Sequence, residues 1–170
     1  MQTFDKYELG RTDETVDITT REENRIAVVK MAQSCQRTIE IISRELDPAL
    51  FDDGEFLDAV KAMVLKNRRA VVRMLVFEPK QIASRRHRLL DLARAMPTFL
   101  EMRVPPQVYQ DFDETVFIAD STGYLHRLYT NRYEAKVNFN DKRVARYMVK
   151  EFDEMWDKSV QDINLRQLSI

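Results

Sequence analysis

Two short runs of apolar and β-branched residues place the strongest constraint on the fold. Residues 38–42 (TIEII) and 71–77 (VVRMLVF) are nearly continuous apolar segments, which is typical of strands covered on both faces. Segments with helical periodicity alternate with them at about 21–36, 53–67 and 80 or 84 to 95. This alternation predicts parallel strands joined by right-handed crossovers.

Helix-start signals support these boundaries. Thr20 and Glu23 have the spacing of a capping box, and either Asp52 or Asp53 can cap the second helix. Cys35 falls on the apolar side of the first helix, so we expect a core residue rather than a nucleophile.

The second half of the chain predicts three more strands and a long helix. The strands are expected at 99–104, 115–119 and 124–129, with turn residues at 120–123 between the last two, and the helix begins near Asp141. The complete order predicts an α/β fold in which a mixed sheet carries helices on both faces.

A chain of 170 residues predicts a single domain. We expect a loosely docked polar extension at 1–19, the domain at 20–160 and a C-terminal tail at 161–170. No apolar run approaches the ~20 residues that span a bilayer, and the first residues lack the apolar core of a secretory signal. With a single cysteine, these features favour a cytoplasmic protein.

Common cofactor and metal motifs are missing from the sequence. The glycines at 10, 54 and 123 form no phosphate-binding loop, and two histidines with one cysteine suit no zinc site. We therefore expect neither a cofactor nor a metal.

Positive charge is concentrated in residues 61–94, which hold ten lysines and arginines against two acidic residues. If Ser84 caps the helix that follows, Arg85, Arg86 and His87 fill its first turn, where free N–H groups suit a phosphate. This predicts an anion-binding site. The alternative is that the helix begins one turn earlier, in which case the three are ordinary solvated surface.

Asp120 and Asn131 lie on and just after the predicted hairpin. Their spacing resembles the end of the phospholipase D superfamily motif, which is His-x-Lys, four residues, Asp, six residues, Gly-Ser and then Asn. In this alignment Asp113 stands at the His position and Thr115 at the Lys position. The order of elements also resembles one half of that superfamily, which implies its fold in a single copy.

Three phrases are similar to an uncharacterised bacterial branch of the superfamily. They are HRLLDLAR (87–94), the hairpin sequence at 117–125 and RYEAKVNFND (132–141). Members of that branch occur alone or behind acetyltransferase-like domains, so the resemblance implies an acetyltransferase as a candidate partner.

The departures from the motif imply a lost activity. Enzymes of the superfamily attack phosphorus with an imidazole and hold the phosphate with lysines, and Asp113 and Thr115 supply neither. The resemblance thus implies a non-catalytic domain that binds a phosphate-bearing ligand or a protein, with Arg127 and Arg132 as further anion contacts. The alternatives are a phosphodiester or phosphoryl-transfer enzyme rewired around His126, and a structural companion of an acetyltransferase.

The resemblance also implies self-association. Superfamily clefts form between two halves related by a twofold axis, and this chain carries one half, so we expect a homodimer that buries the hairpin side. Nucleic acid is a less favoured ligand, because the net charge is −1 and no basic stretch is interleaved with aromatic residues.

Overall fold

The computed structural model describes residues 1–166. They form one seven-stranded sheet in the order β1-β7-β6-β5-β2-β3-β4. β2, β3 and β4 are parallel, whereas β5, β6, β7 and β1 run antiparallel to their neighbours, so the predicted α/β fold with a mixed sheet is confirmed. The strands are β1 (Val16–Ile18), β2 (Thr38–Ile42), β3 (Val71–Leu75), β4 (Leu100–Arg103), β5 (Thr115–Ala119), β6 (Gly123–Arg127) and β7 (Ala135–Asn138).

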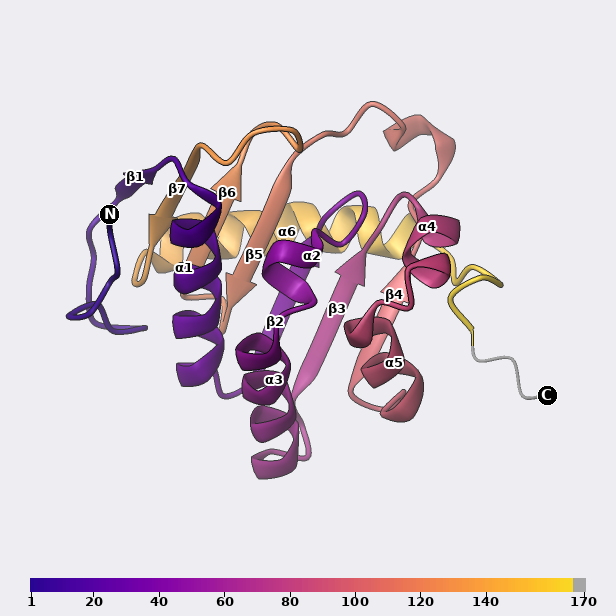
Figure 1. Cartoon of the computed structure of the whole chain (residues 1–170), viewed down its shortest axis with the longest axis horizontal. Coiled ribbons are helices and arrows are strands. Elements are labelled where there is room, and N and C mark those ends of the chain that lie inside the picture. Colours follow the sequence, from indigo (N-terminus) through magenta and orange to yellow (C-terminus); the bar gives the residue numbers. More distant parts are fainter. Residues whose placement is uncertain (167–170) are drawn as a thin grey trace.

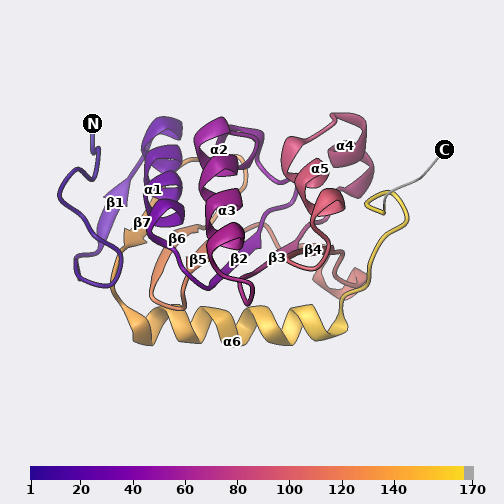
Figure 2. The ribbon, with the colours of Figure 1, turned by 90° about the horizontal axis from the view of Figure 1, so that it is seen from below.

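The two faces of the sheet are covered unequally. Helices α1 to α5 lie over one face, and within the described residues α6 lies by itself across the other (Figures 1 and 2). The helices are α1 (Arg21–Ser34), α2 (Pro48–Phe51), α3 (Gly54–Lys66), α4 (Pro79–Ser84), α5 (Arg88–Ala95), the 3-10 turn η1 (Gln107–Tyr109) and α6 (Lys142–Lys158).

Side-chain caps fix where the longer helices begin. The predicted capping box of Thr20 and Glu23 is confirmed at the start of α1. Of the two candidates for α3, Asp53 is the cap, and it accepts a hydrogen bond from Phe56 N (3.1 Å). Asp141 caps α6 in the same way. Each such cap stabilises its helix by about 1 kcal/mol.

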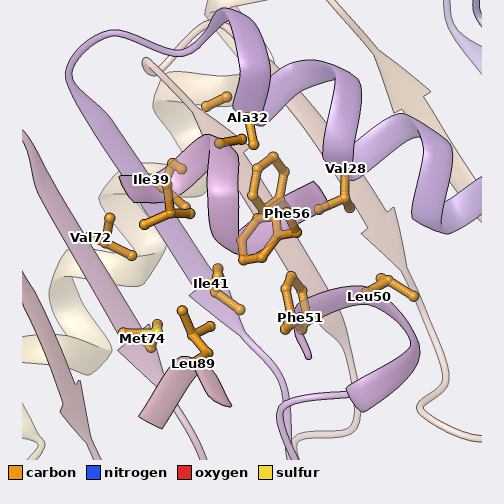
Figure 3. Close-up of a cluster of buried hydrophobic side chains, with 14 of the residues drawn as sticks. Val28, Ala32, Ile39, Ile41, Leu50, Phe51, Phe56, Val72, Met74 and Leu89 are labelled. Atoms are coloured by element: carbon orange, nitrogen blue, oxygen red, sulfur yellow. The ribbon is translucent and has the colours of Figure 1, made fainter. Parts of the chain in front are cut away.

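The larger core fills the space between the sheet and helices α1 to α5. Phe56 lies 5.5 Å from Phe51 and 6.1 Å from Phe117, measured between ring centroids, and Ile39 and Ile41 of β2 face the same cluster (Figure 3). A smaller cluster under α6 is built on the stacked rings of Phe152 and Trp156.

The N-terminal segment is part of the domain, so its prediction as a loosely docked extension is wrong. Phe4 is completely buried against Phe139, with 5.4 Å between ring centroids. Glu23 accepts a hydrogen bond from Gln2 N (2.9 Å), and β1 extends the sheet by pairing with β7. The polar composition of this segment hides the apolar side chains of Phe4 and Ile18, which are buried in the core.

The C-terminal segment is also anchored as far as it is described. Arg94 donates hydrogen bonds to the carbonyls of Asn164 (2.9 Å) and Leu165 (3.3 Å), and Leu165 is buried. Residues 167–170 of the predicted tail lie outside the described part of the chain. Among residues 1–166, none of the helices has the length and apolar character needed to cross a bilayer.

Candidate functional site

Three of the motif positions, Asp113, Thr115 and Asn131, lie at the end of the sheet where the parallel strands β2 and β3 finish, at the top of Figure 1. β5 begins at this end and β6 ends there. Open α/β sheets bind their ligands beyond the carboxyl ends of parallel strands. We call residues 43–47, 111–115 and 127–134 the upper edge.

Arg127 lies inside the upper edge and is held by contacts within the protein. Its exposed fraction is 1%, and it donates hydrogen bonds to Asp47 Oδ2 (3.1 Å) and the Thr130 carbonyl (3.2 Å). The guanidinium carbon also lies 4.6 Å from the centroid of the Tyr133 ring. The expected placement of Arg127 facing a ligand has to be corrected, because the protein itself engages this cation.

Thr115, at the Lys position of the motif, is buried beside Arg127. The two residues are register partners on β5 and β6. The Thr115 hydroxyl and the Arg127 Nε atom are buried and have no hydrogen-bond partner among the described residues. A buried polar atom without a hydrogen-bond partner lowers the free energy of unfolding by about 1–3 kcal/mol. These two atoms therefore destabilise this part of the core.

Two further motif positions lie at the rim of the upper edge. Asp113 presents an exposed carboxylate where the superfamily has an imidazole, and its carbonyl accepts a hydrogen bond from Thr130 Oγ1 (3.0 Å). Asn131 is exposed in the turn between β6 and β7. Arg132, the next residue, is also exposed, and its guanidinium lies over the ring of Tyr129.

Asp120 lies at the opposite end of β5, where its side chain stabilises a turn. Its carboxylate accepts hydrogen bonds from the backbone N–H groups of Gln36 (2.9 Å), Arg37 (2.7 Å) and Thr38 (3.1 Å). It also contacts Cys35 Sγ, and burial together with this carboxylate raises the pKa of the Cys35 thiol. Asp120, at the Asp position of the motif, therefore closes the α1–β2 turn, and Cys35 is a protonated core residue.

The predicted helix over residues 80–95 is two helices, and this removes the expected first-turn site. α4 ends at Ser84 and α5 begins at Arg88. Between them, Arg86 takes a left-handed conformation (φ 54°) and Arg85 pairs with Glu45 (3.2 Å). Neither arginine lies in the first turn of a helix.

His87 is the N-cap of α5 and is buried. Its Nδ1 accepts a hydrogen bond from Leu89 N (3.2 Å), and its Nε2 lies 2.7 Å from the Leu46 carbonyl oxygen. Burial lowers the pKa of His87. This corrects the expected placement of His87 in an anion site, because both ring nitrogens are occupied and the ring is held neutral.

A groove of about 410 Å³ opens on the other face of the sheet, between α6 and the start of β5. Phe112, Val116 and Met148 contribute apolar lining, whereas Glu151 and Glu154 contribute carboxylates. The half-buried His126 lies in the groove, and its Nε2 is paired with Glu114 Oε1. The carboxylate can orient the imidazole, so the groove holds the elements of an acid–base pair.

Sequence patterns alone did not predict the carboxylate partners of Arg127 and His126. Asp47 lies 80 positions from Arg127, and no local pattern relates them. The pairing of Glu114 with His126 follows from strand register. Val116 is the register partner of His126, and Glu114, two positions before Val116, faces the same side of the sheet.

Comparison with solved structures shows the same fold in proteins of low sequence identity. An archaeal chromatin protein described as having a novel mode of DNA binding, TrmBL2, superposes with a TM-score of 0.66 at 18% identity, over 94% of this chain and 57% of that one. This chain thus spans just over half of TrmBL2. The phospholipase D family member Nuc from Salmonella typhimurium gives 0.62 at 16% identity, over 91% of this chain and 100% of its own.

A third structure, NucT from Helicobacter pylori, gives a TM-score of 0.58 at 12% identity and covers 88% of this chain and 99% of its own. The implied phospholipase D-like fold in a single copy is therefore confirmed. Comparison with curated protein sequences gives no match. A family sequence model matches residues 20–168, and the chain belongs to that family, a domain of unknown function named DUF7931.

Proposed function

We propose that this chain is a non-catalytic phospholipase D-like domain that works by binding a protein partner. The observation that carries the proposal is the buried ion pair of Arg127 and Asp47 in the upper edge. Phosphoryl chemistry at this edge would need an imidazole aimed at phosphorus and cations free to hold the phosphate. Asp113 and Thr115 supply neither, and Arg127 is engaged inside the protein.

The choice of a protein over a small phosphate ligand rests on where the expected cations lie. Of the five residues expected to contact an anion, His87 and Arg127 are buried and Arg85 is paired with Glu45. Arg86 and Arg132 remain exposed. The exposed carboxylate of Asp113 adds repulsion for a phosphate approaching the upper edge.

A turnover screen tests the proposal. Purified protein is expected to hydrolyse phosphatidylcholine, bis-p-nitrophenyl phosphate and single-stranded DNA no faster than a buffer blank, with or without divalent metal. A phospholipase D enzyme serves as the positive control. Turnover that is lost in Asp113→Asn would show that the upper edge is catalytic and would overturn the proposal.

One observation favours a second candidate, a phosphodiester or phosphoryl-transfer enzyme rewired around His126. The pairing of His126 with Glu114 inside a groove is the arrangement such an enzyme would use. Against it, Glu151 and Glu154 line the same groove and repel an anionic substrate. Metal-independent turnover that His126→Ala abolishes and Asp113→Asn spares would establish this candidate.

A further inference from the structure

The charges of α6 are divided between its two halves. Residues 142–150 contain four cations and no acidic residue, whereas residues 151–158 contain four acidic residues and one lysine. The four cations are exposed, and none of them forms an ion pair within the part of the chain that the structure describes. They are Lys142, Arg143, Arg146 and Lys150.

The dipole of α6 makes this distribution of charged side chains unfavourable. A helix dipole favours acidic side chains near the N-terminus and cations near the C-terminus. α6 has the reverse order, and its four cations also repel one another within about two turns. An arrangement that is unfavourable in the isolated domain indicates that these charges serve a contact outside it.

The outward row of α6 is nearly symmetric about Lys150. Arg143, Arg146, Lys150, Glu154 and Asp157 are all exposed and follow one another at intervals of three, four, four and three positions, so they share one face of the helix. The positions are symmetric about Lys150, and the charges on its two sides are opposite. α6 is the outermost layer on its side of the sheet, so a second helix can approach this row (Figure 2).

We propose that two copies of this chain associate through antiparallel pairing of their α6 helices. A twofold axis at Lys150 places Arg146 opposite Glu154 of the second copy and Arg143 opposite Asp157, and each contact occurs twice. This inference rests on the proposed function in naming a protein as the partner. It uses the α6 surface, whereas the resemblance implied burial of the hairpin side.

The groove beside α6 adds an apolar contribution to the same interface. Tyr147 is 62% exposed and lines the rim of the groove with Met148 and Glu151. In the antiparallel arrangement Tyr147 of one copy lies level with the groove of the other. Aromatic side chains supply much of the binding energy of protein interfaces, so Tyr147 serves as the anchor and the charged row sets the register.

A polyanion such as DNA is the competing occupant of the cationic half. The phosphates of a nucleic acid that follows the helix beyond Lys150 meet the carboxylates of Glu151, Glu154 and Asp157, all of them exposed. A second α6 places Arg143 and Arg146 opposite carboxylates in four contacts and leaves one like-charge contact, between the two copies of Lys150 on the axis, so the charge pattern favours self-association.

A charge-swap experiment tests the inference. The variant Arg143→Glu with Arg146→Glu has an acidic row, and the variant Glu154→Lys with Asp157→Lys has a basic row. Lys61→Glu with Lys66→Glu, on exposed positions of α3 across the sheet, is the control with the same change in net charge as the acidic variant. Sedimentation velocity at up to about 100 µM protein in about 50 mM salt measures the mass, since surface ion pairs are weakly screened there.

We expect dimers for the parent and for the α3 control, and monomers for each α6 variant alone. An equimolar mixture of the acidic and basic variants should restore the dimer, with an apparent Kd within about tenfold of the parent. Far-UV circular dichroism verifies that every variant is folded. The pairing should weaken several-fold in about 500 mM salt.

Three results would overturn the inference. They are a monomeric parent, an acidic variant that dimerises as the parent does, and a mixture of folded variants that stays monomeric. A monomeric parent that binds an oligonucleotide through Arg143 and Arg146 would assign the patch to a polyanion. Because the proposed function is tested by turnover, its failure is distinguishable from a failure of α6 pairing.

Discussion

At the scale of single residues, Arg127 is a cation expected to contact a ligand that instead stabilises the fold. Its ion pair with Asp47 is nearly free of solvent, with side-chain exposures of 2% and 14%. Removing one partner of such a pair leaves the other as an uncompensated charge, which commonly costs about 3–5 kcal/mol. Asp47 also accepts a hydrogen bond from Ala49 N (3.1 Å) at the start of α2, so the pair joins β6 to that helix.

We expect Arg127→Met to lower the free energy of unfolding by about 3 kcal/mol. Adding Asp47→Asn, which keeps a capping oxygen, should recover part of the loss because the unpaired carboxylate is gone. Urea denaturation measures both, with the exposed Arg132→Met as the control. A loss for Arg127→Met no greater than that of the control would contradict the structural role.

Glu40 is a second buried titratable side chain, and it makes stability depend on pH. It lies on β2 at 2% exposure, 3.4 Å from Arg73, which also pairs with Asp153 (2.8 Å). Burial raises the pKa of Glu40 to about 7, against the attraction of Arg73. The folded protein therefore holds a proton that the unfolded chain releases near its ordinary pKa of 4.5.

The sign of the effect follows from linkage. Between about pH 4.5 and pH 7 the folded state binds more protons, so the Glu40 contribution to stability falls as pH rises and is constant above that range. Glu40→Gln should remove this fall and be more stable than the parent at pH 8, by up to about 3 kcal/mol. The difference between the urea unfolding free energies of parent and variant, measured from pH 5 to 8, isolates Glu40. A difference that does not change with pH, as expected for exposed Glu134→Gln, would refute it.

At the scale of elements, the sequence predicted the strands and helix starts that depend on interactions between residues close together in the chain. Residues 38–42 form β2 and residues 71–75 of the run 71–77 form β3, because their apolar character suits both layers. Thr20 begins α1 through its own hydrogen bonds. The break between α4 and α5 had no such signal, since Arg86 takes the left-handed conformation that glycine or asparagine usually marks. Two short strands were not predicted: β1 depends on pairing with the distant β7, whereas β7 pairs with β6, the strand directly before it.

In the candidate site, too, contacts between residues far apart in the chain could not be predicted from the sequence. Asp120 and Asn131 could be found from their spacing, but the carboxylate contacts that hold the α1–β2 turn are set by tertiary structure. The sequence likewise identified Arg127 as a notable cation without showing that it turns inward. Whether an arginine faces solvent or pairs with a carboxylate 80 positions away depends on the packing of the complete fold.

The N-terminal segment provides a test at this scale. Phe4→Ala should lower the free energy of unfolding by about 3–5 kcal/mol, because a fully buried aromatic side chain leaves a cavity when truncated. Val108→Ala, at a position that is 82% exposed, should cost less than about 0.5 kcal/mol. Thermal and urea unfolding measure both variants. Equal losses for the two would support the prediction that residues 1–19 are a loosely docked extension.

At the scale of the whole molecule, the helices cover the two faces of the sheet unequally. Helices α1 to α5 share one face, while α6 is the one helix of residues 1–166 on the other face and carries opposite charges on its two halves. The positive charge of residues 61–94, by contrast, is partly neutralised where it lies, as in the pairs Arg73–Asp153, Arg85–Glu45 and Arg88–Asp52. Other cations of that segment, such as Lys66, Arg68 and Arg69, are exposed and form no ion pair among the described residues either, so what sets α6 apart is that opposite charges occupy the two halves of one exposed helix face.

If two copies pair through α6, folding and association are linked, and thermal stability must depend on protein concentration. Above Kd, each tenfold rise in concentration adds about 1.4 kcal/mol per dimer, or half of that per chain. For a chain of this length the melting temperature should rise by about 2 °C per tenfold between about 1 and 100 µM, and by less at high salt. The variant Arg143→Glu with Arg146→Glu should melt at one temperature throughout. Scanning calorimetry at three concentrations measures this, and a parent whose melting temperature is equally independent of concentration would show that folding is not coupled to pairing through α6.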